Sequence, residues 1–419
     1  MKVTVVGAGS TYTPELVGGI GRLRDRLDIT DVVLHDVDPV RLEVVAGAAE
    51  RIARAHGFAG TMSCTGNLEA AVEAASAVLI QIRIGGQTAR YRDETIPLAC
   101  GCVGQETTGA GGFAKALRTV PVVLDIAETV RHHAADGAWI IDFTNPVGIV
   151  TRALLDHGHR ALGLCNVAIG FQRLFAEWLQ VSPDSVGLGH AGLNHLTWIR
   201  SVNVDGRDVL PDLLREHGDA IAEHVELPRR IIDNLGAIPS YYLRYFYEHD
   251  AVVDELRRSR SRAEDVMEIE QQLLRLYGDP HLRELPELLL QRGGAYYSEA
   301  ALQLLVSLFG DDGGTHVVDM RNRGTLPFLP DDAVIEVPAL VGSAGAEALP
   351  VADLPAHQAG LIGHVAAYER LTVEAAETGN REVAFRALLT HPLIGQTGTA
   401  EQLLDDLLAA NREYLPAFA

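Results

Sequence analysis

The first part of the chain that can do chemistry is the run Val3-Thr4-Val5-Val6-Gly7-Ala8-Gly9-Ser10. Its two glycines stand where a first strand is expected to turn into a helix, so backbone amides there can approach a pyrophosphate closely. Asp36 stands at the end of the second expected strand. A carboxylate at that place can accept both ribose hydroxyls of NAD and would repel the additional phosphate of NADP. The third glycine of the usual fingerprint is absent, so a phosphate-free tight turn with Asp36 as a strand-end cap is the alternative interpretation.

A second group of candidates consists of residues that can bind a metal ion. Cys165 ends an apolar run and is followed by Asn166, and His195 is preceded by Asn194. Thiolate and imidazole are ligands that transition metals favour, and two protein ligands leave positions free for a catalytic Lewis acid. Taken alone, such a cysteine is more often a buried apolar thiol, and such a histidine is as often a hydrogen-bonded loop residue.

The chain between Gln81 and Asn145 is polar and rich in glycine, which is unusual inside a regular sheet pattern. Arg90 lies in the run Arg90-Tyr91-Arg92-Asp93-Glu94, and a second polar run follows over 104–112. Long loops in a compact domain are usually functional, so we expect functional loops here. A lid that only covers the edge of the sheet is the alternative.

Alternating elements in the first half are expected to position these residues. Short apolar runs predict buried strands, and segments of helical periodicity lie between them. The expected strands are 3–6, 32–34, 77–82, 139–143 and 161–164, and the expected helices are 15–23, 39–55, 113–132 and 147–155. Strands separated by helices predict an α/β fold with a parallel, Rossmann-type sheet and right-handed crossovers.

The pattern changes near residue 170. Two strands are expected, at 186–188 and 197–204. Helical stretches follow as far as residue 247, and further helices are expected at 263–277, 297–309, 356–377 and 400–411. Because no flexible linker marks the change, we expect two packed domains. These are an NAD-binding Rossmann-like domain over 1–168 and a mixed α+β, mainly helical domain over 169–419 for catalysis, substrate binding and oligomerisation.

The composition argues against several classes of partner and location. The formal net charge of the 419 residues is −21, which argues against nucleic acid or anionic lipid as the main partner. No apolar run is long enough to cross a bilayer, and no signal-peptide pattern is present, so a cytoplasmic location is expected. The 4 cysteines are too few for a disulfide scaffold and are expected to be thiols.

Several motifs together resemble glycoside hydrolase family 4. They are Gly7-Ala-Gly-Ser-Thr-Tyr-Thr-Pro14, Gly104-Gln-Glu-Thr-Thr-Gly109, Asp142-Phe-Thr-Asn-Pro146, Gly163-Leu-Cys-Asn166 and Gly192-Leu-Asn-His195. The likeness continues through 239–247, 292–298 and 391–393, so it spans essentially the whole chain. Within the family, the sequence most resembles the 6-phospho-β-glucosidases.

The resemblance implies a lactate- and malate-dehydrogenase-like fold, bound NAD+, and Mn²⁺ or another divalent transition metal. In such enzymes the sugar is oxidised transiently at carbon 3, and the ketone makes the carbon 2 proton acidic. A base removes that proton, the aglycone leaves carbon 1, water adds, and the oxidation is reversed, so there is no net redox change. This family is an exception to the two-carboxylate mechanism of glycosidases. The implied substrate is a phosphorylated disaccharide or aryl glycoside, and the implied assembly is a homodimer or homotetramer.

The resemblance also assigns roles to individual residues. Tyr242 matches the base, with the adjacent Tyr241 left as an alternative. The other assignments are Gly7, Gly9, Ser10, Thr11 and Asp36 for NAD+, Cys165 and His195 for the metal, Arg90, Asn145 and Arg262 for the 6-phosphate, and Asn166 and Asn194 for contacts that hold the substrate or order the ligands.

Departures from the family pattern bear on the substrate. Branches that act on 6-phospho-α-glucosides commonly carry an aspartate, a proton donor, where this chain has Asn166. An amide cannot act as that acid, so we expect a β-linked substrate, with Asn166 beside Tyr242 at the reaction centre. Ala110 and Ala168 stand where the family commonly has proline. These two replacements remove no chemical group that could take part in the reaction.

Three other functions remain open from the sequence. The first is a 2-hydroxy-acid dehydrogenase of the lactate or malate kind, which would show net redox change and need no metal. The second is a sugar-phosphate or NAD-sensing protein without turnover. The third is a glycosidase of the same family that acts on an unphosphorylated or α-linked sugar.

Overall fold

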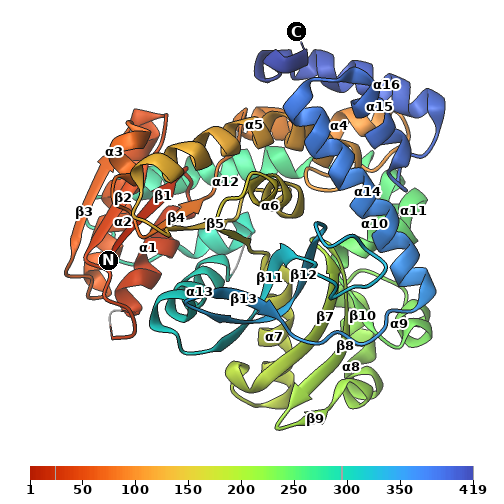
Figure 1. Cartoon of the computed structure of the whole chain (residues 1–419), viewed down its shortest axis with the longest axis horizontal. Helices are drawn as coiled ribbons and strands as arrows, with labels where there is room; N and C mark the ends of the chain where they lie inside the picture. Colours follow the sequence, from red (N-terminus) through yellow and green to blue (C-terminus); the bar gives the residue numbers. More distant parts are fainter. Residues whose placement is uncertain (24, 294–295, 419) are drawn as a thin grey trace.

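The computed structural model describes residues 1–23, 25–293 and 296–418. Within these ranges the strands join one 13-stranded sheet in the order β10-β8-β7-β12-β11-β6-β5-β4-β1-β2-β3, with β13 beside β12 and β9 beside β8 (Figure 1). The motif over 292–298 is described except for residues 294 and 295, which lie outside these ranges.

The first half forms the parallel part of the sheet, as the alternating pattern predicts. Its strands are β1 (Lys2–Val6), β2 (Asp31–His35), β3 (Thr61–Thr65), β4 (Ala77–Ile80), β5 (Trp139–Asp142) and β6 (Ala161–Gly163). Its helices are α1 (Thr13–Arg22), α2 (Pro39–Ala55), α3 (Leu68–Val72), α4 (Gly86–Ala99), α5 (Gly109–His133) and α6 (Val147–Asp156). Ladders between strands such as β4, which is wholly buried and apolar, and β1, which is buried except at Lys2, hold this half together.

The second half continues the same sheet with antiparallel strands, because β11 pairs with β6. The strands are β7 (Val186–Leu193), β8 (Leu196–Val204), β9 (Arg207–Asp208), β10 (Ile238–Pro239), β11 (Gly314–Arg321), β12 (Val334–Gly342) and β13 (Gly345–Ala348). The α-helices are α7 (Asn166–Leu179), α8 (Leu210–His224), α9 (Arg229–Leu235), α10 (Arg244–Tyr247), α11 (His249–Leu256), α12 (Arg262–Tyr277), α13 (Tyr297–Gly310), α14 (Ala356–Thr378), α15 (Arg381–Thr390) and α16 (Thr397–Ala410). Short 3-10 helices are η1 (Pro183–Ser185), η2 (Tyr241–Leu243), η3 (Glu287–Arg292), η4 (Arg412–Tyr414) and η5 (Pro416–Phe418).

The structure corrects the expectation of long loops after β4. Residues 86–99 form helix α4, and α5 begins at Gly109, four residues before the expected start at 113. The side chains of α4 show little apolar periodicity because this helix borders a polar pocket, which Gln87 and Arg90 line. The start of α5 is the run Gly109-Ala110-Gly111-Gly112, which carries no helical pattern of its own. Only the connections 81–85 and 100–108 remain non-helical.

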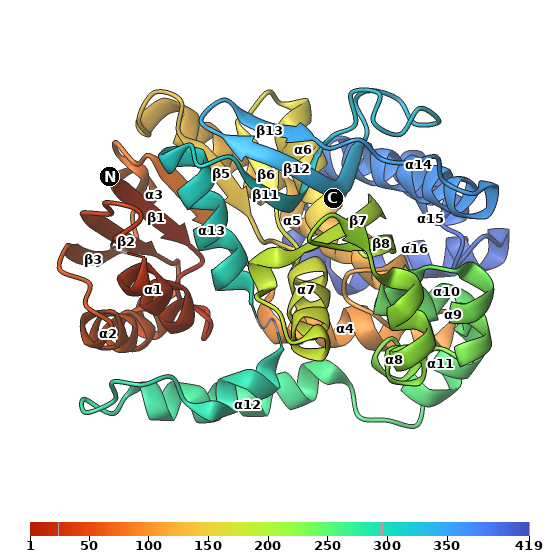
Figure 2. The same ribbon diagram turned by 90° about the horizontal axis from the view of Figure 1, so that it is seen from below.

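Helix α12 lies along one side of the molecule and spans both halves. It packs against α4, α2 and η3, and Figure 2 shows it running below α1, α7 and α4. Its start is fixed by a capping box, in which Ser261 accepts from the Glu264 amide and the Glu264 side chain accepts from the Ser261 amide. The start of this helix lies beside α4, so Arg262, at its first position, reaches the pocket that α4 borders. In the described ranges, no helix is long and apolar enough to span a membrane.

Candidate active site

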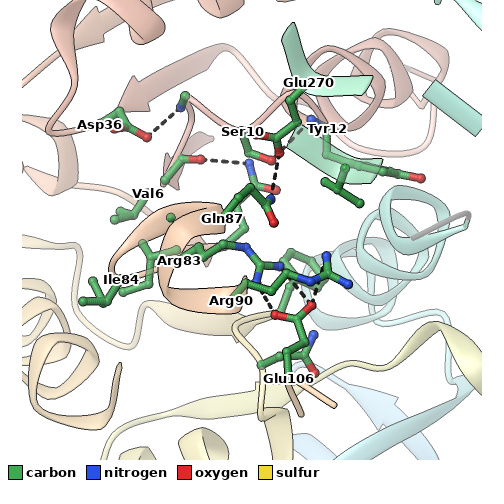
Figure 3. Close-up of a pocket in the computed structure, with 18 of the residues that line it drawn as sticks. Val6, Ser10, Tyr12, Asp36, Arg83, Ile84, Gln87, Arg90, Glu106 and Glu270 are labelled. Carbon is green, nitrogen blue, oxygen red and sulfur yellow. Dashed lines mark hydrogen bonds and ion pairs between the residues drawn. The ribbon is translucent and has the colours of Figure 1, made fainter. Parts of the chain in front are cut away.

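A pocket of about 1120 Å³ opens at the carboxyl ends of the parallel strands. Ligands of open α/β sheets collect at this edge. Most of the residues predicted from the sequence line the pocket, namely Gly7, Gly9, Ser10, Asp36, Arg90, Asn145, Asn166, Tyr241, Tyr242 and Arg262. The structure thus brings together residues that are as far as 255 positions apart in the chain (Figure 3).

The glycine turn after β1 forms one end of the pocket. Gly7 has a φ of +88°, and a Cβ there would lie 2.6 Å from the carbonyl oxygen of Gln81. The amide of Gly9 donates to Asp36 Oδ2 at 2.7 Å, which places the carboxylate beside the turn. This arrangement fits a dinucleotide, because a tight glycine turn and a carboxylate suited to bind a ribose line one pocket. Thr11 does not line the pocket; it is wholly buried, and its carbonyl accepts from the Tyr277 hydroxyl at 2.7 Å.

Ion pairs of Glu270 join helix α12 to the glycine turn. Glu270 lies 2.9 Å from Arg41 Nη2 and 3.0 Å from Arg292 Nη2, and Arg41 Nε donates to the carbonyl of Gly9 at 2.6 Å. Gln87 also donates to Glu270, at 3.2 Å. Glu270, Arg41 and Arg292 were not predicted as site residues from the sequence, although Arg292 begins the family-like run 292–298.

A buried carboxylate gathers cations in the middle of the pocket. Glu106 forms ion pairs with Arg83, with Arg90 Nη1 at 3.3 Å and with Lys115 Nζ at 2.7 Å, and Figure 3 shows Arg83 and Arg90 converging on it. Burial alone would raise the pKa of Glu106, but the three cations hold it well below its usual range. Burial, with the neighbouring Arg83, lowers the pKa of Lys115 to about 7 despite Glu106. Glu106 is therefore an ionised anchor for the cations of the pocket.

Replacing Glu106 by glutamine should destabilise the protein. Glutamine keeps the shape but removes the charge that compensates Arg83, Arg90 and Lys115, and an uncompensated buried charge costs about 3 kcal/mol or more. We expect the free energy of unfolding in urea to fall by about 3 kcal/mol. As a control, Glu413→Gln removes the solvent-exposed partner of Arg92 and should cost less than about 1 kcal/mol. Equal stability of the two variants would contradict the anchoring role of Glu106.

The two arginines predicted to bind phosphate have different surroundings. Arg90 is largely buried and is paired with Glu94 at 2.7 Å as well as with Glu106. Glu94 also accepts from the amide of Ala263 at 2.8 Å, which ties α4 to the start of α12. Arg262 is exposed, and its Nη2 donates to the carbonyl of Gln291 at 2.5 Å. A guanidinium has five N–H donors, so Arg262 keeps donors for an anion in the pocket.

The predicted metal ligands lie behind the pocket wall. Cys165 precedes the first residue of α7, and His195 occupies the turn between β7 and β8 with a φ of +64°. Both are buried, at 5% exposure each. The side chain of Asn194, the residue before His195, bonds to Cys165, so the turn that carries His195 also contacts the thiol. Asn194 Nδ2 also donates to Glu336 Oε2 at 2.9 Å.

The polar atoms of this pair fit a metal ion. His195 Nε2 is buried and has no hydrogen-bond partner among the described residues. Burial, helped by Glu336, raises the pKa of the Cys165 thiol, and burial lowers the pKa of His195 to about 4, so the imidazole is neutral. A soft sulfur and a neutral imidazole nitrogen are a donor set for a divalent transition metal. The described residues include no group of three or more His, Cys, Asp and Glu arranged to hold a metal ion, so the two-ligand site stays a prediction.

Tyr242 connects the pocket to the predicted metal ligands. Its ring stacks on the imidazole of His195, with the centroids 3.6 Å apart and the planes at 9°. Tyr241 lies beside it with a centroid separation of 4.7 Å, and both rings line the pocket. Burial, together with Tyr241 and Cys165, raises the pKa of Tyr242 well above its usual range. Tyr242 contributes, after Glu106 and Glu94, to the raised pKa of Arg90, but Arg90 does not bring the pKa of the Tyr242 phenol down to its usual range.

Asparagines complete this end of the pocket. Asn145 follows β5 and is bonded to the phenol of Tyr297, while its Oδ1 is buried without a partner among the described residues. Asn166 is the first residue of α7 and lines the pocket. Both amides therefore offer neutral hydrogen-bonding groups to a ligand that reaches Tyr242.

Two family models match almost the whole chain. The model "Family 4 glycosyl hydrolase" matches residues 2–181, and "Family 4 glycosyl hydrolase C-terminal domain" matches residues 190–394. A probable 6-phospho-beta-glucosidase of Bacillus subtilis is 36% identical over 100% of this chain and 98% of its own. A 6-phospho-beta-glucosidase of Thermotoga maritima is 37% identical over 99% of both chains.

Solved structures support the same relationship. A structure of the Thermotoga maritima 6-phospho-beta glucosidase with manganese, NAD+ and glucose-6-phosphate superposes with a TM-score of 0.93 at 36% identity, over 99% of both chains. A malate dehydrogenase of Salinibacter ruber, at 18% identity and a TM-score of 0.52, shares the fold alone. The predicted Rossmann-type fold is confirmed. On its sequence, its fold and the models that cover both of its halves, the chain belongs to family 4 of the glycosyl hydrolases.

Proposed function

We propose that this chain hydrolyses 6-phospho-β-glucosides with NAD+ and a divalent metal, Mn²⁺, as cofactors. One observation carries the proposal: a single pocket runs from the glycine turn with Asp36 to Tyr242, which is stacked on His195. When bound, the two cofactors supply a reversible oxidation at sugar carbon 3 and a Lewis acid for the oxygen there. The relatives named 6-phospho-beta-glucosidase support this substrate class.

The residues of the chain divide the remaining tasks. Gly7, Gly9 and Ser10 form the tight turn that lets the pyrophosphate come close, and Asp36 accepts the ribose hydroxyls. Thr11 does not reach the pocket with its side chain, so its predicted role reduces to shaping the turn. Cys165 and His195 hold the metal, with Asn194 ordering Cys165. Tyr242 takes the proton from carbon 2, and its stacking on His195 fixes it close to the metal.

The substrate is held at its phosphate and at its glycosidic bond. The 6-phosphate is bound by Arg262, Arg90 and Asn145. Because Arg90 already pairs with Glu94 and Glu106, most of the N–H donors for the phosphate come from Arg262. Asn166 stands at the sequence position where family branches that act on α-linked substrates commonly carry an aspartate acid. Its amide binds but does not protonate, so we assign the β-anomer. The natural substrate is then a phosphorylated disaccharide or an aryl glycoside.

The domain division, assembly and location stay proposals. The NAD-binding part is residues 1–168 and the catalytic and oligomerisation part is residues 169–419, although α7 crosses this boundary and β11 joins β6 in one sheet. We propose a homodimer or homotetramer in the cytoplasm.

The proposed function is tested with p-nitrophenyl β-glucoside, with and without a 6-phosphate. NAD+, Mn²⁺ and a reductant are each left out in turn. We expect cleavage of only the phosphorylated compound, dependence on all three additions, and no net NADH. Cleavage of only the plain glucoside would reject the phosphate assignment, and net NADH formation would favour a dehydrogenase.

Replacing Arg262 by glutamine should weaken binding of the phosphorylated substrate. A charged hydrogen bond to phosphate is lost, which predicts a KM about 10- to 100-fold higher and a kcat changed much less. Arg258→Gln is the matched control, since Arg258 is exposed and pairs with Asp254 at 3.5 Å. If KM for the phosphorylated substrate stays unchanged in the Arg262 variant, Arg262 does not bind the phosphate.

A further inference from the structure

The side chain of Gln105 is held in one orientation by the backbone that follows it. Its Oε1 accepts hydrogen bonds from the amides of Thr107 and Thr108, the second at 2.9 Å. Because amide N–H groups only donate, the atom that faces them is the carbonyl oxygen of Gln105 and not its NH₂ group. This atom therefore has no hydrogen to offer to any neighbour.

The hydroxyl of Thr107 lies between that oxygen and the imidazole of His195. Thr107 Oγ1 is 2.8 Å from Gln105 Oε1 and 3.1 Å from His195 Nδ1. A hydroxyl has one hydrogen, and Gln105 Oε1 has none, so the Thr107 hydrogen must point at Gln105. His195 Nδ1 then carries a hydrogen and donates it to Thr107 Oγ1. In the opposite arrangement, two oxygen lone pairs would face each other at 2.8 Å.

We propose that Gln105 and Thr107 are positioning residues that fix His195 as the Nδ1–H tautomer and thereby present its Nε2 lone pair to the metal. A neutral imidazole has one donor and one acceptor nitrogen, so a hydrogen on Nδ1 leaves a lone pair on Nε2. Nε2 is the buried atom that has no partner among the described residues. The inference rests on the proposed function only in taking His195 as a metal ligand.

The loop that carries Gln105 and Thr107 is packed closely enough to hold this geometry. A Cβ at Gly111 would lie 2.2 Å from the carbonyl oxygen of Gln105, and one at Gly112 would lie 2.7 Å from that of Thr107. The loop therefore rests directly on the first turn of α5. Tyr242 covers one face of the same imidazole at a centroid distance of 3.6 Å. The ring of His195 is thus held at its Nδ1 edge by Thr107 and on one face by Tyr242.

The first test is the affinity of the full chain for Mn²⁺ in the presence of NAD+, measured from the electron paramagnetic resonance signal of free Mn²⁺. Thr107→Val keeps the shape but removes the hydroxyl, and we expect Mn²⁺ binding about 10- to 100-fold weaker. Thr107→Ser restores the hydroxyl and should bind Mn²⁺ nearly as wild type does. Thr108→Val, which removes a neighbouring hydroxyl not bonded to His195, should also bind like wild type. Wild-type affinity in Thr107→Val would overturn the inference.

The second test reads the tautomer itself and needs no variant of the loop. Imidazole ¹⁵N resonances of the metal-free chain, with His195 identified by comparison with His195→Gln, distinguish a hydrogen on Nδ1 from one on Nε2. We expect the hydrogen on Nδ1, and an Nε2–H signal would overturn the inference. Neither test depends on sugar cleavage. If the chain cleaves no 6-phosphoglycoside but both tests give the expected results, the substrate assignment fails and this inference stands.

Discussion

Replacing Tyr242 by phenylalanine should stop proton removal from carbon 2 while leaving NAD+ bound. Phenylalanine keeps the ring that stacks on His195 at 3.6 Å, so the site should keep its shape and lose only the phenolic oxygen. A positioned general base contributes about 10²- to 10⁴-fold to a rate, and we expect kcat to fall by that factor. Exchange of the carbon 2 proton with deuterium oxide should fall with it. Binding of NAD+, measured by calorimetry, should change little.

Tyr241→Phe is the matched control for this prediction. Tyr241 lines the same pocket next to Tyr242, but the ring that stacks on His195 is that of Tyr242. We expect less than a tenfold loss of kcat and continued proton exchange in this variant. If instead Tyr241→Phe stops the exchange and Tyr242→Phe does not, the base is Tyr241, and the alternative left open by the sequence is correct.

The chemistry of the site could largely be predicted because it lies in short local motifs. The glycine turn and Asp36 stand at strand ends, and Cys165 and Tyr242 stand in runs that resemble the family's motifs, so all of them could be singled out without any knowledge of the fold. A parallel sheet then brings strand ends to one edge, so their proximity follows from the alternation of strands and helices. The pocket that the glycine turn, Asp36 and Tyr242 share agrees with this reasoning, whereas Cys165 lies behind the pocket wall.

The residues that the sequence did not reveal act through contacts between distant segments. Glu270 on α12 meets Arg41 on α2 and Arg292 on η3, and no spacing along the chain announces these pairs. Glu106 lies within a motif, but its role depends on cations that come from three other segments. Sequence patterns report periodicity and local motifs, and they do not report which charges meet.

The antiparallel strands β11 and β12 were missed for a different reason. Each carries a fully buried carboxylate, Asp319 in β11 and Glu336 in β12, which breaks the apolar pattern expected of a central strand. Glu336 is held by His190 at 2.7 Å and by Asn194 at 2.9 Å. Its charge thus lies next to the predicted metal ligands, where the interior tolerates it because it is hydrogen-bonded. The pattern of β12 is therefore interrupted by Glu336, a carboxylate that lies beside the predicted metal site.

Replacing Cys165 by serine should weaken Mn²⁺ binding and activity together. A neutral hydroxyl is a poor substitute for a thiolate ligand of a transition metal, and the site has only one other predicted protein ligand, His195. Loss of an outer-shell partner typically costs 10- to 100-fold in metal affinity, so loss of a direct ligand should cost about 100-fold or more. Activity at limiting Mn²⁺ should fall by the same factor and recover partly as Mn²⁺ is raised.

Oxidation of the wild-type thiol should reproduce the effect of the serine variant, because a sulfinic or sulfonic acid is no longer a thiolate ligand. Cys64 is exposed and would react first, so the experiment uses a Cys64→Ser background. Cys102→Ser is the control for a buried thiol away from the site and should keep wild-type affinity for Mn²⁺. Activity that survives a chelator and a thiol-blocking reagent alike would show that Cys165 is not a ligand. A loss of Mn²⁺ affinity that follows oxidation of Cys165 but not substitution of Cys102, and that added Mn²⁺ partly reverses, is the result expected if Cys165 is one of two protein ligands.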